Sequence, residues 1–167
     1  IKSSTIAENS LACVIKQDDN TFVSVVDIET GREMVNFPLP NRDYYDIYFS
    51  PCARYLVIPC RDFLSDLAKG LASVVSDIVF VDVKKRITKM HNDASLSCIF
   101  THDGKYVLTL FFRHANLYAL KDFSLMKTFN FSEDMGSVKS YVSLSNIYIS
   151  NNWRGGKELN TRNWTLK

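Results

Sequence analysis

A three-residue pattern recurs four times along this chain of 167 residues, and its spacing limits the folds that the chain can adopt. Each copy consists of an apolar or aromatic residue, a small or acidic residue and an aliphatic residue. Successive copies lie 37 to 55 residues apart, close to the repeat length of small four-stranded sheets that stack in series. The repeat therefore predicts stacked sheets rather than one α/β enzyme core. The copies begin at Val26, Val81, Tyr118 and Trp164.

The composition is that of an ordinary globular protein. Hydrophobic residues make up 46% of the sequence and charged residues 23%, and an aromatic content of 13% favours strands. A net charge of +2 neither indicates nor excludes a nucleic-acid partner. The sequence has no apolar stretch of the roughly 20 residues that a membrane span needs, and residues 1–5 show no signal-peptide pattern. Its four cysteines lack metal or redox spacing, which favours reduced thiols and a cytoplasmic or nuclear location.

Residues 93–131 show the pattern of one sheet most clearly. Apolar residues alternate over 95–100, and Asp103-Gly104 then supplies a tight hairpin turn. The continuous apolar run at 106–112 is typical of a strand that is buried on both faces. Two further strands are expected, at 116–120 and 125–131. This unit predicts a four-stranded antiparallel sheet.

The remaining sequence divides into similar units at about 1–40, 41–92 and 132–167, within one domain of residues 1–167. Unit 1–40 shows three strand patterns and lacks an opening strand, whereas unit 132–167 lacks a closing strand. In unit 41–92 a single opening strand is expected over residues 45–49, where apolar residues alternate. We therefore expect two complete sheets flanked by two partial ones.

Two predicted hairpins resemble the first hairpin of the WD40-repeat family. They read Phe49-Ser50-Pro51 and Phe100-Thr101-His102-Asp103-Gly104. His91 stands where the family's histidine does, and Trp164 is similar to the family's tryptophan. The family's aspartate has counterparts at Asp27 and Asp82. The resemblance covers nearly the whole chain and implies an all-β fold of β-propeller blades, with structural roles for His91, Asp103, Gly104 and Trp164.

Departures from the family pattern indicate that the repeats have diverged from it. No repeat carries both the tryptophan and the aspartate, and Met90 replaces the glycine before His91. Pro40 stands in place of a histidine, and Phe112 in place of the aspartate of the family's hydrogen-bonded network. We therefore expect apolar packing, more than a polar network, to hold the sheets together.

The number of predicted strands is small for a closed propeller. Closed propellers have about four to eight blades, and this sequence supplies about three and a half. Three arrangements follow: a segment of a larger propeller, a small four-bladed propeller, or an open array that a partner completes. The first is favoured because both ends of the sequence fall within a unit.

Residues 61–76 interrupt the second unit and are the best candidate for a binding element. A regular sheet needs only a few residues there, and loops of more than about a dozen residues are often functional. The apolar residues fall near helical spacing, which predicts a short helix or an ordered loop. They either pack back on the sheets or bind a partner. The candidate partner-binding residues are Phe63, Leu64, Leu67 and Leu71.

The densest basic cluster is expected in the next hairpin, at Lys84, Lys85, Arg86 and Lys89. Such a cluster can contact phosphates or an acidic protein surface, although a solvated turn is the commoner explanation. The C-terminal residues add further basic side chains at Arg154, Lys157, Arg162 and Lys167.

No pattern in the sequence indicates an enzyme. His91, His102 and His114 are expected at different ends of one sheet, so they do not predict a metal site. The sequence contains no nucleophile elbow, phosphate loop or dinucleotide motif. We therefore expect a non-enzymatic scaffold that binds other proteins of an assembly, without cofactor or metal. The alternative is a propeller associated with RNA or a nucleoprotein through the basic hairpin and the C-terminal residues.

Overall fold

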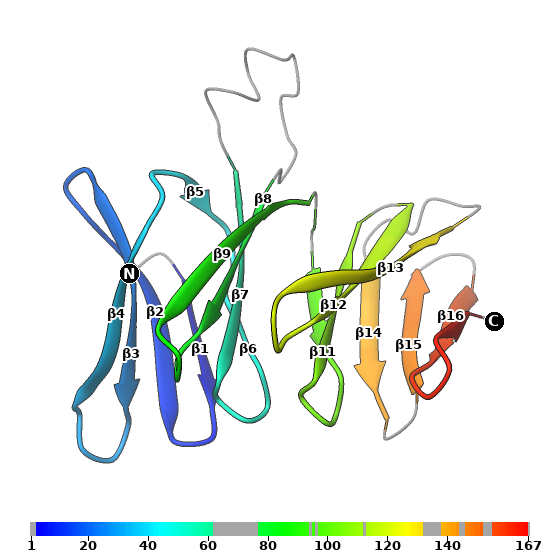
Figure 1. The fold of residues 1–167 in the computed structure, drawn as a ribbon, viewed down its shortest axis with the longest axis horizontal. Coiled ribbons are helices and arrows are strands. Elements are labelled where there is room, and N and C mark those ends of the chain that lie inside the picture. Colours follow the sequence, from blue (N-terminus) through cyan, green and yellow to red (C-terminus); the bar gives the residue numbers. More distant parts are fainter. Residues whose placement is uncertain are drawn as a thin grey trace, which may run out of the picture. The chain divides into compact units, whose positions relative to one another are not determined.

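The computed structural model describes residues 3–61, 77–93, 95, 97–111, 113–131, 138–143, 146–151 and 155–166. All regular elements in these ranges are β-strands, and they form antiparallel sheets, which confirms the expected all-β fold (Figure 1). The chain divides into two compact units, Ile1–Ser95 and Leu96–Lys167, and each unit contains two sheets. Within the described ranges no helix is long and apolar enough to cross a membrane.

The first sheet of the N-terminal unit has four strands, and the expectation that its opening strand is missing was wrong. β1 pairs with β2 from Ser3 opposite Val14 to Ala7 opposite Ser10. β1 is mostly polar, and its one large apolar residue, Ile6, is 65% exposed, so the segment lacks the usual apolar signal of a strand. The strands lie in the order β1 (Ser3–Ala7), β2 (Ser10–Gln17), β3 (Asn20–Asp27) and β4 (Glu33–Leu39).

The second sheet has an opening strand that is split in two, where the sequence predicted one continuous strand. Tyr45 N–H donates to the carbonyl of Pro59 at 3.4 Å, so this edge of Pro59 faces the opening strand. Proline has no N–H to donate along that edge, and the ladder is interrupted there. The strands are β5 (Asp43–Tyr44), β6 (Tyr48–Phe49), β7 (Tyr55–Arg61), β8 (Asp77–Asp82) and β9 (Ile87–Asn92).

The two sheets of the N-terminal unit share one apolar core. Alternate residues of β2 and β3, such as Val14 and Val25, pack with alternate residues of β7 and β8, such as Leu56 and Val81. All four of these side chains are fully buried. The first strands of the two sheets, β1 and β6, lie beside one another.

The C-terminal unit repeats this arrangement with a third and a fourth sheet. A second apolar core joins them, and it includes Leu108 and Leu117 of the third sheet and Ile147 and Leu159 of the fourth. The fourth sheet has a closing strand, β17, which the sequence did not predict because only two residues form it. The strands are β10 (Ser97–Phe100), β11 (Tyr106–Leu110), β12 (His114–Ala119), β13 (Ser124–Asn130), β14 (Val138–Val142), β15 (Asn146–Asn151), β16 (Gly155–Asn160) and β17 (Thr165–Leu166).

The turn between the third and fourth strands is the same in all four sheets. Each of these turns contains a residue with a left-handed backbone conformation shortly before the fourth strand. Only glycine adopts this conformation without steric cost, and only the first sheet has glycine there. The residues and their φ angles are Gly31 (66°), Arg86 (56°), Phe123 (57°) and Trp164 (54°).

A side-chain oxygen at the end of the third strand holds the first two of these turns. Asp27 Oδ1 accepts the N–H of Thr30 at 2.8 Å, and Asp82 Oδ1 accepts the N–H of Lys85 at 2.9 Å. Aspartate at this position therefore caps the turn, which is a local role that its short acidic side chain is suited to fill.

In the fourth sheet the same position is occupied by Asn160, which the sequence pattern did not identify. Its Oδ1 accepts the N–H of Arg162 at 2.9 Å, and its carbonyl accepts the N–H of Trp164 at 2.9 Å. The fourth copy of the three-residue pattern, at Trp164, is thus one strand out of register. The structural equivalent of Val26-Asp27-Ile28 is Leu159-Asn160-Thr161.

Candidate interaction surface

One face of the first sheet is turned away from the core of its unit. Side chains alternate between the two faces of a strand, so the neighbours of the core residues Val14, Val23 and Val25 point away from that core. We call this side the open face of the first sheet. It carries Ser4, Ile6, Leu11, Cys13, Ile15, Phe22, Ser24, Val26, Glu33, Asn36 and Pro38.

The open face contains two apolar rows that run across the strands. One row consists of Ile6, Leu11 and Val26, and the other of Ile15, Phe22 and Pro38. Ile6 and Pro38 are exposed, and the remaining four side chains are half-buried. Both rows therefore leave apolar surface in contact with solvent.

Small polar side chains separate the two apolar rows. Cys13 and Ser24 are 7% and 4% exposed, because the larger residues on either side shield them. Ser24 Oγ donates a hydrogen bond to Glu33 Oε1 at 2.6 Å, and Asn36 Nδ2 donates to the same oxygen at 3.2 Å. The Glu33 carboxylate is thereby fixed over the edge of the sheet at β4.

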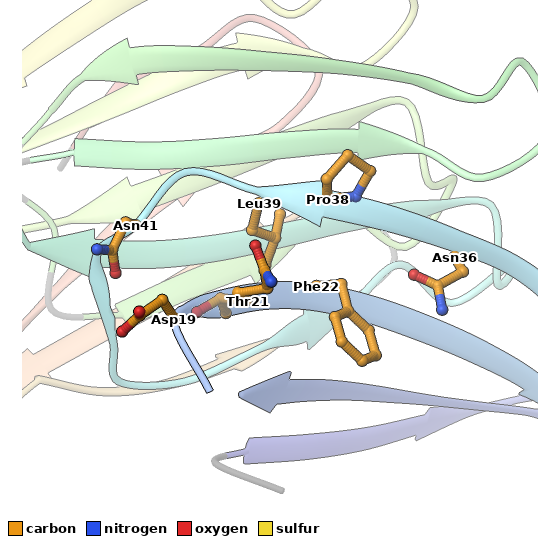
Figure 2. A pocket seen from close by; sticks show the side chains of 8 residues that line it. Asp19, Thr21, Phe22, Asn36, Pro38, Leu39 and Asn41 are labelled. Atoms are coloured by element: carbon orange, nitrogen blue, oxygen red, sulfur yellow. The ribbon is translucent and has the colours of Figure 1, made fainter. Parts of the chain in front are cut away.

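A hollow of about 360 Å³ lies at one end of the first sheet (Figure 2). Its lining comes from the turn between β2 and β3, from β3, from β4 and from the segment that follows β4. Figure 2 shows Asp19 and Asn41 toward one end of the lining and Asn36 toward the other, with Phe22 and Pro38 between them. The lining residues are Asp19, Asn20, Thr21, Phe22, Asn36, Pro38, Leu39 and Asn41.

Sequence reasoning missed both the open face and the hollow. The hollow brings Asp19, in the turn after β2, together with Asn41, which lies beyond the next two strands. The open face did have a signal, because residues 11–15 and 22–26 are apolar at nearly every position. Strands of that kind are typical of sheets that are covered on both faces.

The predicted basic cluster lies where the sequence placed it, around the turn between β8 and β9. The side chains of Lys84, Lys85, Arg86 and Lys89 are exposed. Arg86 Nη2 donates to the backbone carbonyl of Met34 at 3.4 Å, which ties this turn to β4 of the first sheet. A phosphate or acidic partner for the cluster stays a prediction.

Beside this cluster, an ion pair holds the buried carboxylate of Asp82. Asp82 is 1% exposed, and Arg54 Nη2 lies 3.0 Å from its Oδ2. Burial alone would raise the pKa of Asp82, but the hydrogen bonds from Arg54 and from the Lys85 N–H outweigh burial and lower it. Asp82 is therefore a charged structural group and not a proton donor near neutral pH.

Each of the four residues predicted to be structural has a ring contact, a hydrogen bond or a defined turn conformation. The His91 ring meets the ring of Phe80 edge-on, at 5.3 Å between centroids. Asp103 Oδ1 accepts the hydroxyl of Thr101 at 2.7 Å. Gly104 has a φ of 63° and is the left-handed residue of that hairpin. The Trp164 ring lies edge-on to Tyr106 at 5.0 Å.

The predicted partner-binding residues Phe63, Leu64, Leu67 and Leu71 lie outside the described residues. Their role, like the helix or loop expected over 61–76, stays a prediction.

Burial disfavours the thiolate form of two of the buried cysteines. Burial raises the pKa of Cys60 to about 12, and the nearby Asp77 carboxylate adds to the rise. Burial likewise raises the pKa of Cys13. In the part of the chain that the structure describes, no three His, Cys, Asp or Glu side chains are grouped in a way that could hold a metal ion.

Comparisons with known proteins bear on the fold alone. No family model matches the sequence, and no curated protein matches it. Apo AztD from Citrobacter koseri is a similar solved structure, with a TM-score of 0.70 at 8% sequence identity. The likeness covers 99% of this chain and 44% of that chain, so this chain spans less than half the length of that protein. In all, 792 solved chains match the fold, which is therefore too common to indicate one function.

Proposed function

We propose that this chain is a non-enzymatic scaffold of propeller blades, and that a protein partner packs on the open face of its first sheet. The observation that carries the proposal is that the strands are apolar in composition while their side chains on that face are partly exposed. β2 and β3 have the apolar composition of strands covered on both sides, yet four side chains of the apolar rows are only half-buried and Ile6 is 65% exposed.

The arrangement of the sheets supports the propeller part of the proposal. Within each unit, two antiparallel sheets pack face to face and approach one another at their opening strands, β1 with β6 and β10 with β14. Blades of a propeller stack in this way, since a single small sheet cannot bury both of its faces. The likeness to a chain of more than twice the length supports a larger assembly of such sheets.

The size of the apolar rows supports a protein partner. Completing the burial of a half-exposed aliphatic or aromatic side chain contributes about 1 kcal/mol. The open face has several such side chains. The free energy gained by burying all of them is on the order of the smallest estimates of the free-energy cost of bringing two proteins together. A partner would thus need both the apolar rows and some polar anchor.

The experiment compares two lysine substitutions at exposed apolar residues. Ile6→Lys places a charge on the open face, whereas Leu125→Lys places one on β13 of the other unit, where Leu125 is 51% exposed. Proteins that co-purify with the wild-type chain are identified, and their affinity for each purified variant is measured by calorimetry. We expect Ile6→Lys to weaken binding at least tenfold and Leu125→Lys to leave it unchanged. Equal affinities for the wild-type chain and Ile6→Lys would overturn the proposal.

A further inference from the structure

The open face of the first sheet has an equivalent in the second sheet and another in the fourth. In each of these sheets the residue that caps the turn after the third strand pairs with a residue of the second strand, and the next residue of the second strand points to the opposite face. The capping pairs are Asp27 with Ser10, Asp82 with Tyr55 and Asn160 with Asn146. The residues that follow on the second strand, Leu11, Leu56 and Ile147, are therefore equivalent.

In the second and fourth sheets this face packs on the sheet that precedes it in the same unit. Leu56 belongs to the core that the second sheet shares with the first, and Ile147 belongs to the core that the fourth shares with the third. Both side chains are 0% exposed, whereas Leu11 is half-buried. The first sheet is thus the one of these three whose equivalent face has no sheet on it in its unit.

The neighbours of Leu11 in the same row show the same contrast. Val26 on β3 is half-buried, and both of its equivalents are 0% exposed. Ile6 on β1 is 65% exposed, and its equivalents Phe49 and Val142 are 8% and 37% exposed. The row therefore matches rows that a preceding sheet buries elsewhere in the molecule. The equivalents of Val26 are Val81 and Leu159.

The two sheets that bury these rows have a common design. In the first and third sheets, alternate residues of the inner strands supply an apolar face, and the fourth strand adds a phenylalanine, Phe37 or Phe129. Each phenylalanine lies at the same distance along the chain from the left-handed turn residue, Gly31 or Phe123. A row of this kind is covered by the apolar face of another small antiparallel sheet, since neither sheet can bury such a face alone.

A second copy of this chain is poorly suited to supply that sheet from the faces that the structure describes. The face of the fourth sheet that points away from its core is polar, and Tyr148 Oη donates there to Glu158 Oε1 at 3.4 Å. The face of the second sheet that carries Phe80 is already buried. Pairing two open faces would bring a Glu33 carboxylate from each copy into one interface. A different protein fits better.

We propose that the partner on the open face contributes a four-stranded antiparallel sheet of its own, which packs its apolar face on Ile6, Leu11 and Val26. The proposal rests on the proposed function, because it names what the partner presents there. Glu33 pairs with Val26 and lies at the rim of this interface, since its equivalent in the second sheet, Thr88, is exposed beside the covered face. The carboxylate keeps its contact with water and provides the polar anchor.

The test uses an added copy of the first sheet as the probe. Residues 1–42 are placed directly before Ser3 of the chain, because residues 40–42 connect the first sheet to the second. Access to the original open face is measured as the rate of thiol labelling of Ile6→Cys, in a Cys52→Ser background that removes the exposed cysteine. We expect the added sheet to slow labelling at least tenfold relative to the same variant without it, because Ile6 is 65% exposed in the chain alone.

A matched control carries Val14→Lys and Val25→Lys in the added copy alone. Both side chains lie on the apolar face that would cover the row, and a charge there is costly to bury. The control should label as fast as the chain without an added sheet. Equal labelling rates in the tandem chain and its control would overturn the proposal.

The same thiol reports on the natural partner, which is the protein identified by co-purification with the wild-type chain. Benzophenone maleimide attached to Ile6→Cys is cross-linked to that partner, and the linked peptide is sequenced. We expect a segment in which apolar residues alternate, as in a strand, and apolar residues at helical spacing would contradict the proposal. The tandem chain should bind this partner at least tenfold more weakly than its control, because the added sheet occupies the open face.

The outcomes separate this inference from the function on which it rests. If Ile6→Lys abolishes partner binding but the added sheet does not protect the thiol, the sheet is wrong and the scaffold stands. If the added sheet protects the thiol but Ile6→Lys leaves partner binding intact, the open face accepts a sheet and the proposed function is wrong. Self-association of the wild-type chain that Ile6→Lys abolishes would overturn the proposal in favour of a second copy.

Discussion

The first and second sheets of the N-terminal unit differ in how far the face that points away from their shared core is buried. Each contributes alternate residues to the core that they share, and these residues are buried in both. On its other face the second sheet buries Val57, Ile78 and Phe80 completely, whereas the first sheet leaves Phe22 half-buried and Ile6 65% exposed. The difference shows that an apolar strand composition indicates that both faces of a strand should be buried. It does not indicate which part of the protein, or which partner, buries them.

The two sheets also differ in how they close the same turn. Asp27 caps its turn at the surface with a hydrogen bond from Thr30, and Gly31 provides the left-handed residue. In the second sheet Asp82 is buried against Arg54, and Arg86 takes the left-handed position. The second sheet thus has a non-glycine residue in a left-handed conformation that the first sheet assigns to glycine.

The largest expected difference is between two phenylalanines on corresponding faces. Phe80→Ala should lower the free energy of unfolding by about 3–5 kcal/mol, because it removes a fully buried ring and leaves a cavity. Phe22→Ala should cost only about 1 kcal/mol, because the ring is already half in contact with solvent. Urea unfolding of the two variants measures both values. Similar losses would mean that the open face is as well covered as the far face of the second sheet.

A smaller difference is expected from the two turn aspartates. Asp82→Asn keeps an oxygen for the Lys85 N–H but loses the ion pair with Arg54, which is one-third exposed. We expect a loss of about 1–2 kcal/mol at pH 7. Asp27→Asn should have a smaller effect, because an amide oxygen can replace the carboxylate at a solvated turn.

The pH dependence of stability provides an independent check on Asp82. The pKa of this group is lowered in the folded state, so its contribution is present above the unfolded pKa of about 3.9 and is lost as pH falls through the folded pKa. The wild-type chain should therefore lose this contribution below about pH 4. Asp82→Asn should show a flatter stability profile in that range, and an identical profile would contradict the role of the ion pair.

The sequence predicted well wherever a short segment determines its own structure. The hairpin at Asp103-Gly104 needed only a residue suited to a left-handed turn. β1 could not be predicted, since its polar residues become a strand only by pairing with β2. The split between β5 and β6 likewise depends on which edge of Pro59 faces its neighbour.

The candidate site was out of reach of sequence analysis for the same reason. The hollow joins Asp19, in the turn after β2, to Asn41, in the segment after β4, and only the paired strands bring them together. The wrong alignment at Trp164 has a related cause: Asn160 caps its turn as Asp27 does, but a pattern that required an acidic or small residue passed over it.

The smallest expected effects concern the left-handed turn residues, and here the two sheets should respond in opposite directions. A Cβ at Gly31 would meet no atom within 4 Å, so Gly31→Ala should cost only the backbone strain of about 1 kcal/mol. Arg86→Gly relieves that strain but adds freedom to the unfolded chain and loses the hydrogen bond to Met34, so the gain should be below about 1 kcal/mol. Thermal unfolding of the two variants gives the sign of each change. A loss of stability in Arg86→Gly as large as that in Gly31→Ala would show that the contact of Arg86 with β4 outweighs the strain of its backbone.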